Sequence, residues 1–467
     1  MAIQSINPAT GAVLATYDEF TPAEIEAAVG AAQGAFAAWR SSTISERADG
    51  LRAVAATLRA RQARYAALIT AEMGKPILEA EAEIEKCAWA CEYFAEQGGR
   101  FLAPEPTATN AQESYVEFAP LGVILAIMPW NFPFWQLFRF AAPTLMAGNT
   151  AVLKHASNVP GCALAIEEVF ADSGLPEGVL RTILAPGQAA EALIGDPRIR
   201  AVTLTGSDGA GVRVGAAAGR ALKKAVLELG GSDPFIVLAD ADIGAAATTA
   251  ARARNLNAGQ SCIAAKRFLV EEAVAEEFED RFCAAVAALR VGDPTERTTQ
   301  VGPMARADLR EALQRQVSES TAMGARVALG GAIPPGPGYF YPPTVLTGVT
   351  PEMPVFREET FGPVAAVRRV ADAHEAIRGA NDSNFGLGAA LWTADLDRAR
   401  RLVSEIESGS VFVNGMVSSD PRLPFGGVKR SGYGRELAIF GIREFVNIQT
   451  VWIGPDRAGG QAAASTE

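Results

Sequence analysis

The sequence predicts an α/β protein built on a mainly parallel, doubly wound sheet. From Val123 onward, short apolar runs alternate with helical segments: "TAVLK" precedes a helix over about 160–173, and "AVTLTGS" precedes one near 209–219. Strand–helix alternation of this kind builds βαβ units. A second alternating stretch runs from about 240 to 425. Because 467 residues are too many for one ordinary core, we expect roughly three domains or subdomains.

The first hundred residues are expected to be helical. The segment "TPAEIEAAVGAAQGAFAAWR" begins with Thr21 and Glu24 in a capping-box pattern and continues with apolar residues at helical spacing. Two further segments, 45–73 and 77–97, have the same character. At the other end of the chain, "DRAGGQAAASTE" is small and polar and is expected to fray.

Segment 118–138 carries no charged residue and is long enough to suggest a membrane span. Prolines and polar residues would interrupt such a span and leave polar groups in lipid: Pro120, Pro129, Asn131, Pro133 and Gln136. We therefore expect a buried strand, "GVILAIM", that continues into a buried loop and helix, and no membrane association.

The composition excludes some functional classes. A net charge of −11 disfavours nucleic acid as a main partner, because phosphate binding requires a basic face. The N-terminus lacks the charged and apolar regions of a signal peptide, and the five scattered cysteines fit reduced thiols in a cytoplasmic protein. Cys87 and Cys91 lie four residues apart on an expected helix with no histidine nearby, so no metal site is expected.

Three loops that follow expected strands are candidates for a cofactor site: 129–135, 154–158 and 205–211. The last, "TGSDGAG", places Gly206 and Ser207 before a helix, where free N–H groups and the helix dipole suit a phosphate. A plain capped turn is an equally good interpretation. Lys154 ends a buried strand, and its charge needs either a carboxylate or a nucleotide as partner.

Glu228 and Cys262 are the candidate catalytic pair. Glu228 ends a strand before a Gly-Gly turn, where burial would raise its pKa toward that of a general base. Cys262 follows "GQS" in a stretch of small residues. Each has a plain alternative, since Glu228 could be an ordinary capping carboxylate and Cys262 could simply pack in the core.

Five motifs together are more specific than any one of them. They are "PWNFP" (129–133), "LELGG" (227–231), "GQSC" (259–262), "EETFGPV" (358–364) and "PFGGVKRSGYGRE" (424–436). In this order and at this spacing they resemble the aldehyde dehydrogenase superfamily over nearly the whole chain. The resemblance implies two doubly wound α/β domains plus a small β oligomerisation element, and hence a homodimer or homotetramer.

The resemblance also implies domain boundaries. Residues 1–102 and 121–229 would form the dinucleotide-binding domain, and 230–435 the catalytic domain. Residues 103–120 and 436–455 would form the oligomerisation element, with 456–467 as a flexible tail.

The resemblance further implies a role for each matching residue. Cys262 would be the nucleophile, Glu228 the general base that activates water, and Asn131 an oxyanion donor together with the Cys262 backbone N–H. The NAD or NADP site would be lined by Trp130, Lys154, Ser157, Gly206, Ser207, Leu229, Glu359 and Phe361. This chemistry needs no histidine, which disfavours a cysteine hydrolase that uses His155 or His374. The presence of Glu228 favours release of a free acid over transfer to coenzyme A.

Two positions bear on specificity. NAD-preferring relatives frequently carry glutamate three residues after the lysine, but this chain has Ser157, so we expect NADP to be accepted. The segments around Arg139 and Ser419 resemble bacterial succinate-semialdehyde dehydrogenases, in which these residues hold the distal carboxylate of the substrate. A structural ion pair is the alternative for Arg139, and lactaldehyde or glutarate semialdehyde are alternative substrates.

Overall fold

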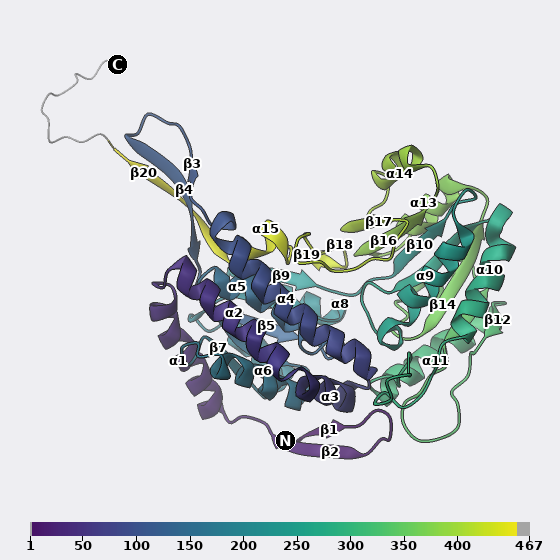
Figure 1. The fold of residues 1–467 in the computed structure, drawn as a ribbon, viewed down its shortest axis with the longest axis horizontal. Helices are drawn as coiled ribbons and strands as arrows, with labels where there is room; N and C mark the ends of the chain where they lie inside the picture. The colour runs from purple at the N-terminus through teal and green to yellow at the C-terminus, as the bar shows by residue number, and fades with distance from the viewer. Residues whose placement is uncertain (1, 455–467) are drawn as a thin grey trace, which may run out of the picture.

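The computed structural model describes residues 2–454, and two mainly parallel sheets organise it (Figure 1). The first sheet has the order β19-β9-β8-β5-β6-β7, so that the chain winds outward from β5 in both directions. Its parallel strands are β5 (Val123–Met128), β6 (Thr150–His155), β7 (Leu180–Ile183), β8 (Ile199–Thr205) and β9 (Lys224–Glu228). The predicted doubly wound α/β class is thereby confirmed for this part of the chain.

Helices cover both faces of the first sheet. One face packs against α5 (Trp135–Met146) and α6 (Pro160–Asp172), with α2 (Ile44–Ala60), α3 (Gln62–Met73) and α4 (Ile77–Phe101) outside them. The other face packs against α1 (Pro22–Trp39), α7 (Gly187–Leu193) and α8 (Asp208–Arg220). This explains why β5 is apolar at nearly every position, since both of its faces are buried.

The N-terminal region agrees with the helical prediction except at two places. The capping boxes at Thr21 and Thr43 are both formed, but the expected helix over 45–73 is divided into α2 and α3 at Arg61. A hairpin of β1 (Ala2–Ile6) and β2 (Val13–Asp18) was not anticipated. The turn within it contains Gly11 at φ +76, and Ser5 anchors it by donating to Glu72 of α3 at 2.8 Å.

The second sheet has the order β12-β13-β14-β11-β10-β16-β17. Its strands are β10 (Asp233–Val237), β11 (Ala265–Glu271), β12 (Arg326–Leu329), β13 (Thr344–Thr347), β14 (Val364–Val370), β16 (Gly388–Trp392) and β17 (Ser410–Val413). Only β12 pairs antiparallel within it. One face packs against α9 (Ile243–Asn255) and α10 (Glu272–Ala287). The other packs against α11 (Ala307–Ala322), α12 (Pro354–Arg357), α13 (Ala373–Asn381) and α14 (Leu396–Val403).

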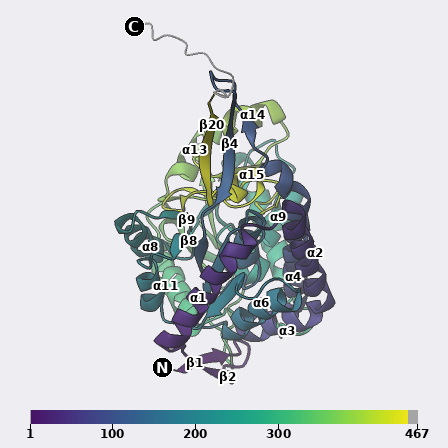
Figure 2. The same cartoon turned by 90° about the vertical axis from the view of Figure 1, so that its left-hand side faces the viewer.

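A separate three-stranded sheet projects from the body (Figures 1 and 2). In it β4 (Glu113–Pro120) pairs antiparallel with β20 (Val446–Ile453) along its whole length, and β3 (Glu105–Pro106) adds a short edge. The two strands come from 103–120 and 436–455, the segments that the resemblance assigned to one element. The short helix α15 (Ala438–Ile442) precedes β20.

Short strands near the end of the expected catalytic domain, 230–435, do not belong to the second sheet. The segment assigned to the end of the catalytic domain returns to the first sheet, where β19 (Gly432–Tyr433) pairs with β9 and places Gly432 opposite Glu228. A two-strand pair joins β15 (Phe385–Gly386), which lies between β14 and β16 in the chain, to β18 (Val428–Lys429), which lies between β17 and β19. The tail predicted for 456–467 lies outside the described residues. Within 2–454, no helix is long and apolar enough to cross a membrane.

Candidate active site

Cys262 lies in a tightly fixed loop between the 3-10 helix η1 (Leu256–Gly259) and β11. Asn257 has φ +55, a left-handed conformation that costs energy for a non-glycine residue. Its side chain holds the loop by donating to the carbonyl oxygens of Asn131 at 2.7 Å and Gln260 at 3.1 Å. Its backbone N–H donates to the Glu79 carboxylate at 2.8 Å. Contacts from three parts of the chain therefore set the position of the cysteine.

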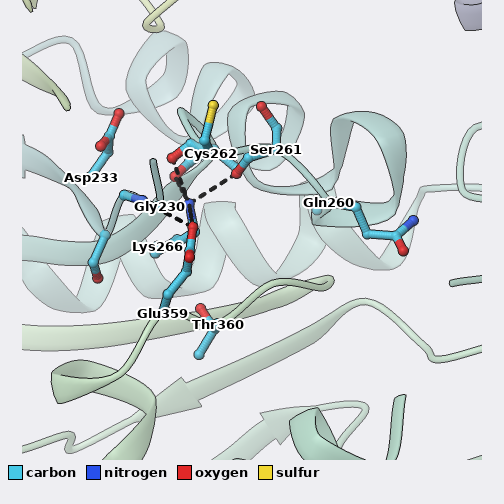
Figure 3. A network of polar contacts seen from close by, with 12 residues as sticks. Gly230, Asp233, Gln260, Ser261, Cys262, Lys266, Glu359 and Thr360 are labelled. Carbon is cyan, nitrogen blue, oxygen red and sulfur yellow. Dashed lines mark hydrogen bonds and ion pairs between the residues drawn. The ribbon is translucent and has the colours of Figure 1, made fainter. Parts of the chain in front are cut away.

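Lys266, in β11, stabilises the same loop. The sequence did not mark this residue as part of the site. Its ammonium, which is fully buried, donates to the carbonyls of Ser261 at 2.9 Å, Cys262 at 2.8 Å and Ala264 at 3.3 Å. It also pairs with Glu359 at 3.6 Å, as Figure 3 shows. The Cys262 sulfur points away from this ion pair (Figure 3). The lysine thus holds the backbone of the nucleophile and leaves its thiol free.

The Cys262 thiol has a raised pKa. Burial raises its pKa to about 11, although the positive charges of Arg139 and Lys266 act in the opposite direction. A thiol is a much weaker nucleophile than a thiolate, so attack on a carbonyl needs a group that accepts its proton.

Glu228 is the candidate general base for the attack of water. It ends β9, is 2% exposed, and neither carboxylate oxygen has a hydrogen-bond partner within residues 2–454. Burial raises its pKa well above the usual range, and the neighbouring Glu436 carboxylate raises it further, while Arg139 and Arg435 lower it. Gly426 leaves room for this group, because a Cβ there would lie 2.7 Å from Glu228 Oε1. An unpaired, desolvated carboxylate is the environment a general base requires.

Asn131 lies in the loop after β5 and reaches the loop that carries the cysteine. Its Nδ2 donates to the Gln260 carbonyl at 3.1 Å, and its Oδ1 accepts from Gln136 at 3.4 Å. An amide nitrogen carries two N–H donors, so one remains for an oxyanion. The structure therefore holds Asn131 against the loop that carries Cys262, and both ends of the amide have a hydrogen-bond partner.

The predicted dinucleotide residues fit an anionic cofactor. Lys154 at the end of β6 has no ion pair within the described part of the chain, and burial lowers its pKa. Ser157 is exposed, and Ser207 caps α8 by accepting from the Ala210 N–H at 3.3 Å. An unpaired lysine, a free hydroxyl and a capped helix N-terminus suit a nucleotide phosphate or ribose.

The remaining cofactor residues lie at the junction of the two sheets. Glu359 accepts from the Gly231 N–H at 3.0 Å. Gly230 permits this position, because a Cβ there would lie 2.4 Å from Glu359 Oε2. Phe361 meets Trp130 edge to face, with ring centroids 5.7 Å apart. Gly206 precedes α8, and Leu229 packs so closely on that helix that a Cβ at Gly211 would lie 2.4 Å from it.

The two predicted substrate residues lie in different surroundings. Arg139, in α5, is 1% exposed, forms a buried ion pair with Glu436, and lies over the Phe425 ring at 4.3 Å. The structural ion pair considered as its alternative is therefore formed. Ser419, which is 8% exposed, accepts from Lys86 Nζ at 2.7 Å and from Trp135 Nε1 at 3.1 Å. Glu436 lies in the "GYGRE" motif, so its sequence context had marked it, but its role had not been assigned.

His155 is not available as a base for Cys262. Its Nε2 is 2.8 Å from the Pro133 carbonyl and its Nδ1 accepts from the Ala156 N–H at 2.8 Å. Burial lowers its pKa to about 4. Both ring nitrogens are thus occupied by backbone groups, which agrees with a mechanism that uses no histidine.

A family model described as the aldehyde dehydrogenase family matches residues 1–451. The chain belongs to the aldehyde dehydrogenase family. The resemblance inferred from the five motifs is thereby confirmed. With Cys262, Glu228 and Asn131 at the motif positions, this family member has the parts needed to oxidise an aldehyde with a nicotinamide cofactor.

Individual members of the aldehyde dehydrogenase family are also similar along nearly their full length. A probable NADP(+) succinate-semialdehyde dehydrogenase of Synechocystis is 52% identical, covering 97% of this chain and 100% of that protein. An NAD(P)+ succinate semialdehyde dehydrogenase of Escherichia coli is 52% identical, covering 96% and 97%. A crystal structure of the succinic semialdehyde dehydrogenase of Streptococcus pyogenes with NADP+ is 36% identical with a TM-score of 0.94, covering 97% and 100%.

Proposed function

We propose that the protein oxidises succinate semialdehyde to succinate with NADP or NAD. The observation that carries this proposal is the 52% identity, over almost the whole of each chain, to two succinate-semialdehyde dehydrogenases. The contact of Asn131 with the Gln260 carbonyl, two residues before Cys262, and the unpartnered carboxylate of Glu228 support the proposal.

The chain's own residues account for the covalent steps. Cys262 loses its thiol proton to solvent water and adds as the thiolate to the aldehyde carbon. The resulting oxyanion accepts hydrogen bonds from the free N–H of Asn131 and the Cys262 backbone N–H. A bound nicotinamide supplies the acceptor for the hydride that leaves this carbon. Glu228 then takes a proton from water, which attacks the thioester on Cys262 and releases the carboxylic acid. Loss of one oxyanion donor typically costs about 10²–10³ in rate.

NADP is proposed to be accepted because Ser157 carries no charge that would repel a 2′-phosphate. Lys154, unpaired within residues 2–454, supplies a positive charge three residues away. The measurement is kcat/KM with each cofactor. A hundredfold preference for NAD would contradict the proposal.

Arg139 and Ser419 are proposed to contact the distal carboxylate of the substrate. The buried ion pair with Glu436 leaves part of the Arg139 guanidinium for a second anion, and its charge already acts on Cys262 and Lys86. Replacing Arg139 with alanine should raise the KM for succinate semialdehyde more than that for its methyl ester, which lacks the charge. An equal change in both KM values would refute this contact.

The projecting sheet is proposed to join subunits in at least a dimer, in the cytoplasm. Apolar side chains on β20 are exposed: Ile448 at 64%, Trp452 at 51% and Ile453 at 44%. A narrow sheet with exposed apolar residues is marginally stable alone, so a second subunit would stabilise it. Light scattering on the purified protein would measure the mass in solution.

The deciding experiment follows NAD(P)H absorbance with succinate semialdehyde, with and without coenzyme A. We expect turnover without coenzyme A, and none in the Cys262→Ala variant. A higher kcat/KM for lactaldehyde or glutarate semialdehyde, or a requirement for coenzyme A, would refute the proposed function.

A further inference from the structure

Lys86 is a largely buried lysine that lacks a carboxylate partner. It lies in α4, where its Nζ donates to Ser419 Oγ at 2.7 Å and lies 4.3 Å from the ring centroid of Trp135. Within residues 2–454 it forms no ion pair. A partly buried cation with only a hydroxyl and an aromatic ring as partners can accept an anion at little further desolvation cost.

The acidic groups near Lys86 are already engaged elsewhere. Glu83 pairs with Lys75 and also accepts from the backbone N–H groups of Phe134 at 2.9 Å and Trp135 at 3.0 Å. Asp420 is held by the Arg422 side chain at 2.6 and 2.9 Å. No described carboxylate therefore neutralises the Lys86 ammonium directly, and the missing anion is not one of these side chains.

Ser419 is preorganised to donate to that anion. Its Oγ accepts from Lys86 at 2.7 Å and from Trp135 Nε1 at 3.1 Å, so its own O–H has no acceptor among these contacts. A serine hydroxyl has one donor and two acceptor positions, and here both acceptor positions are filled. Lys86 uses one of its three N–H donors on Ser419. Two N–H donors of Lys86 and the O–H donor of Ser419 thus remain unused next to each other.

This place lies on the substrate side of the site. The positive charge of Arg139 acts on Cys262, on Glu228 and on Lys86, so Arg139 lies near the catalytic groups and near the lysine. The Arg139 charge is offset by Glu436, whereas that of Lys86 is not. The lysine is therefore the stronger net attraction for an incoming carboxylate.

We infer that Lys86 is the principal cation that binds the distal carboxylate of the substrate, with the Ser419 hydroxyl donating to the same group. This inference rests on the proposed function, because it explains how a short aldehyde with a terminal carboxylate is selected. Arg139 then acts as a second, partly neutralised cation beside it. Trp135 holds the donor pair in place through its contacts with both residues.

The test compares Lys86→Met with wild type on succinate semialdehyde and on its methyl ester, methyl 4-oxobutanoate. A charge-assisted contact of this kind corresponds to roughly 10- to 150-fold in binding. We expect KM for the acid to rise by about that factor in Lys86→Met, and KM for the ester to stay essentially unchanged. Lys86→Arg, which keeps the charge, should retain most of the preference for the acid.

Lys223→Met is the matched control, since this lysine is also partly buried and donates to a backbone carbonyl, that of Asp196. It should leave both KM values unchanged. An equal rise in KM for acid and ester in Lys86→Met would overturn the inference. So would a complete loss of activity through misfolding in both Lys86→Met and Lys86→Arg. If wild type shows no preference for the acid over the ester, the proposed function fails as well. If wild type and Lys86→Met both prefer the acid over the ester to the same degree, the role of Lys86 is refuted and the proposed function stands.

The pH dependence gives an independent check. Burial lowers the pKa of Lys86 to about 8, and Arg139 lowers it as well, while Cys87, Glu83 and Asp420 raise it. The lysine therefore loses its charge as pH rises through this value, and KM for the acid should rise above about pH 8 while KM for the ester does not. In Lys86→Arg the rise should disappear, because an arginine stays charged in this range. A rise that persists in Lys86→Arg would contradict the assignment.

Discussion

Replacing Lys266 with methionine is expected to destabilise the loop that carries the nucleophile. The change removes hydrogen bonds of 2.8, 2.9 and 3.3 Å to three backbone carbonyls and the 3.6 Å ion pair with Glu359. Hydrogen bonds to a charged group contribute about 1.5–3 kcal/mol each, partly offset by the cost of burying the ammonium. Removing one partner of a buried pair costs about 3–5 kcal/mol, which we take as the expected loss.

Urea unfolding, followed by fluorescence and by residual activity, measures this loss. Lys223→Met again serves as control, because that ammonium donates to one carbonyl and is only partly buried, so that screening by solvent reduces its loss to about 1 kcal/mol. A shifted nucleophile should also lower kcat about 10²-fold, since small misplacements of a reacting group have effects of this size. If Lys266→Met unfolds within 1 kcal/mol of the control and keeps its kcat, the role given to Lys266 is wrong.

Two further predictions concern the catalytic groups. Glu228→Gln should lower steady-state turnover by about 10²–10⁴-fold but keep a first-turnover burst of NAD(P)H, measured by stopped flow. If the burst is lost while the cofactor still binds normally, Glu228 acts before hydride transfer. Alkylation of Cys262 by iodoacetamide in the free enzyme, followed by peptide mass spectrometry, should rise about tenfold per pH unit between pH 7 and 10, because burial holds the thiol pKa at about 11. A plateau below pH 9 would show that the thiolate is already formed at neutral pH.

The parallel strands of the first sheet were predictable because burial on both faces leaves a plain signal. β5 is apolar at every position, β6 is buried at all positions except Lys154, and turn residues bound them. The β1–β2 hairpin gave no such signal. Its burial pattern is largely exposed, and a contact with Glu72 in α3 anchors it, 67 residues from Ser5. Edge strands that depend on tertiary contacts are not encoded by local periodicity.

The site shows the same division. Cys262, Glu228 and Asn131 were predicted as catalytic residues because each lies in one of the five motifs that resemble the aldehyde dehydrogenase family. Lys86 lies within "AEIEKCAW", where alternating charges read as the solvated face of a helix. Only the fold brings it to Ser419, 333 residues away in the chain. A charge that acts through a distant partner leaves no local pattern, so neither Lys86 nor its role was readable from the sequence.

Arg139 has two proposed roles, contact with the substrate carboxylate and control of the Glu228 pKa, and experiments can separate them. Its charge lowers the pKa of Glu228, which burial and Glu436 raise. Removing it should therefore leave Glu228 more often protonated and slow hydrolysis of the thioester, which lowers kcat for succinate semialdehyde and its methyl ester alike. Lys86→Met lacks this effect on Glu228, so its loss should appear in KM and only for the acid. Combining Arg139→Ala with Glu436→Gln removes the buried carboxylate that Arg139 had neutralised, and kcat for the ester should partly recover. If kcat for the ester is unchanged in Arg139→Ala, the arginine does not control the protonation of Glu228, and the electrostatic coupling inferred from the buried pair is refuted.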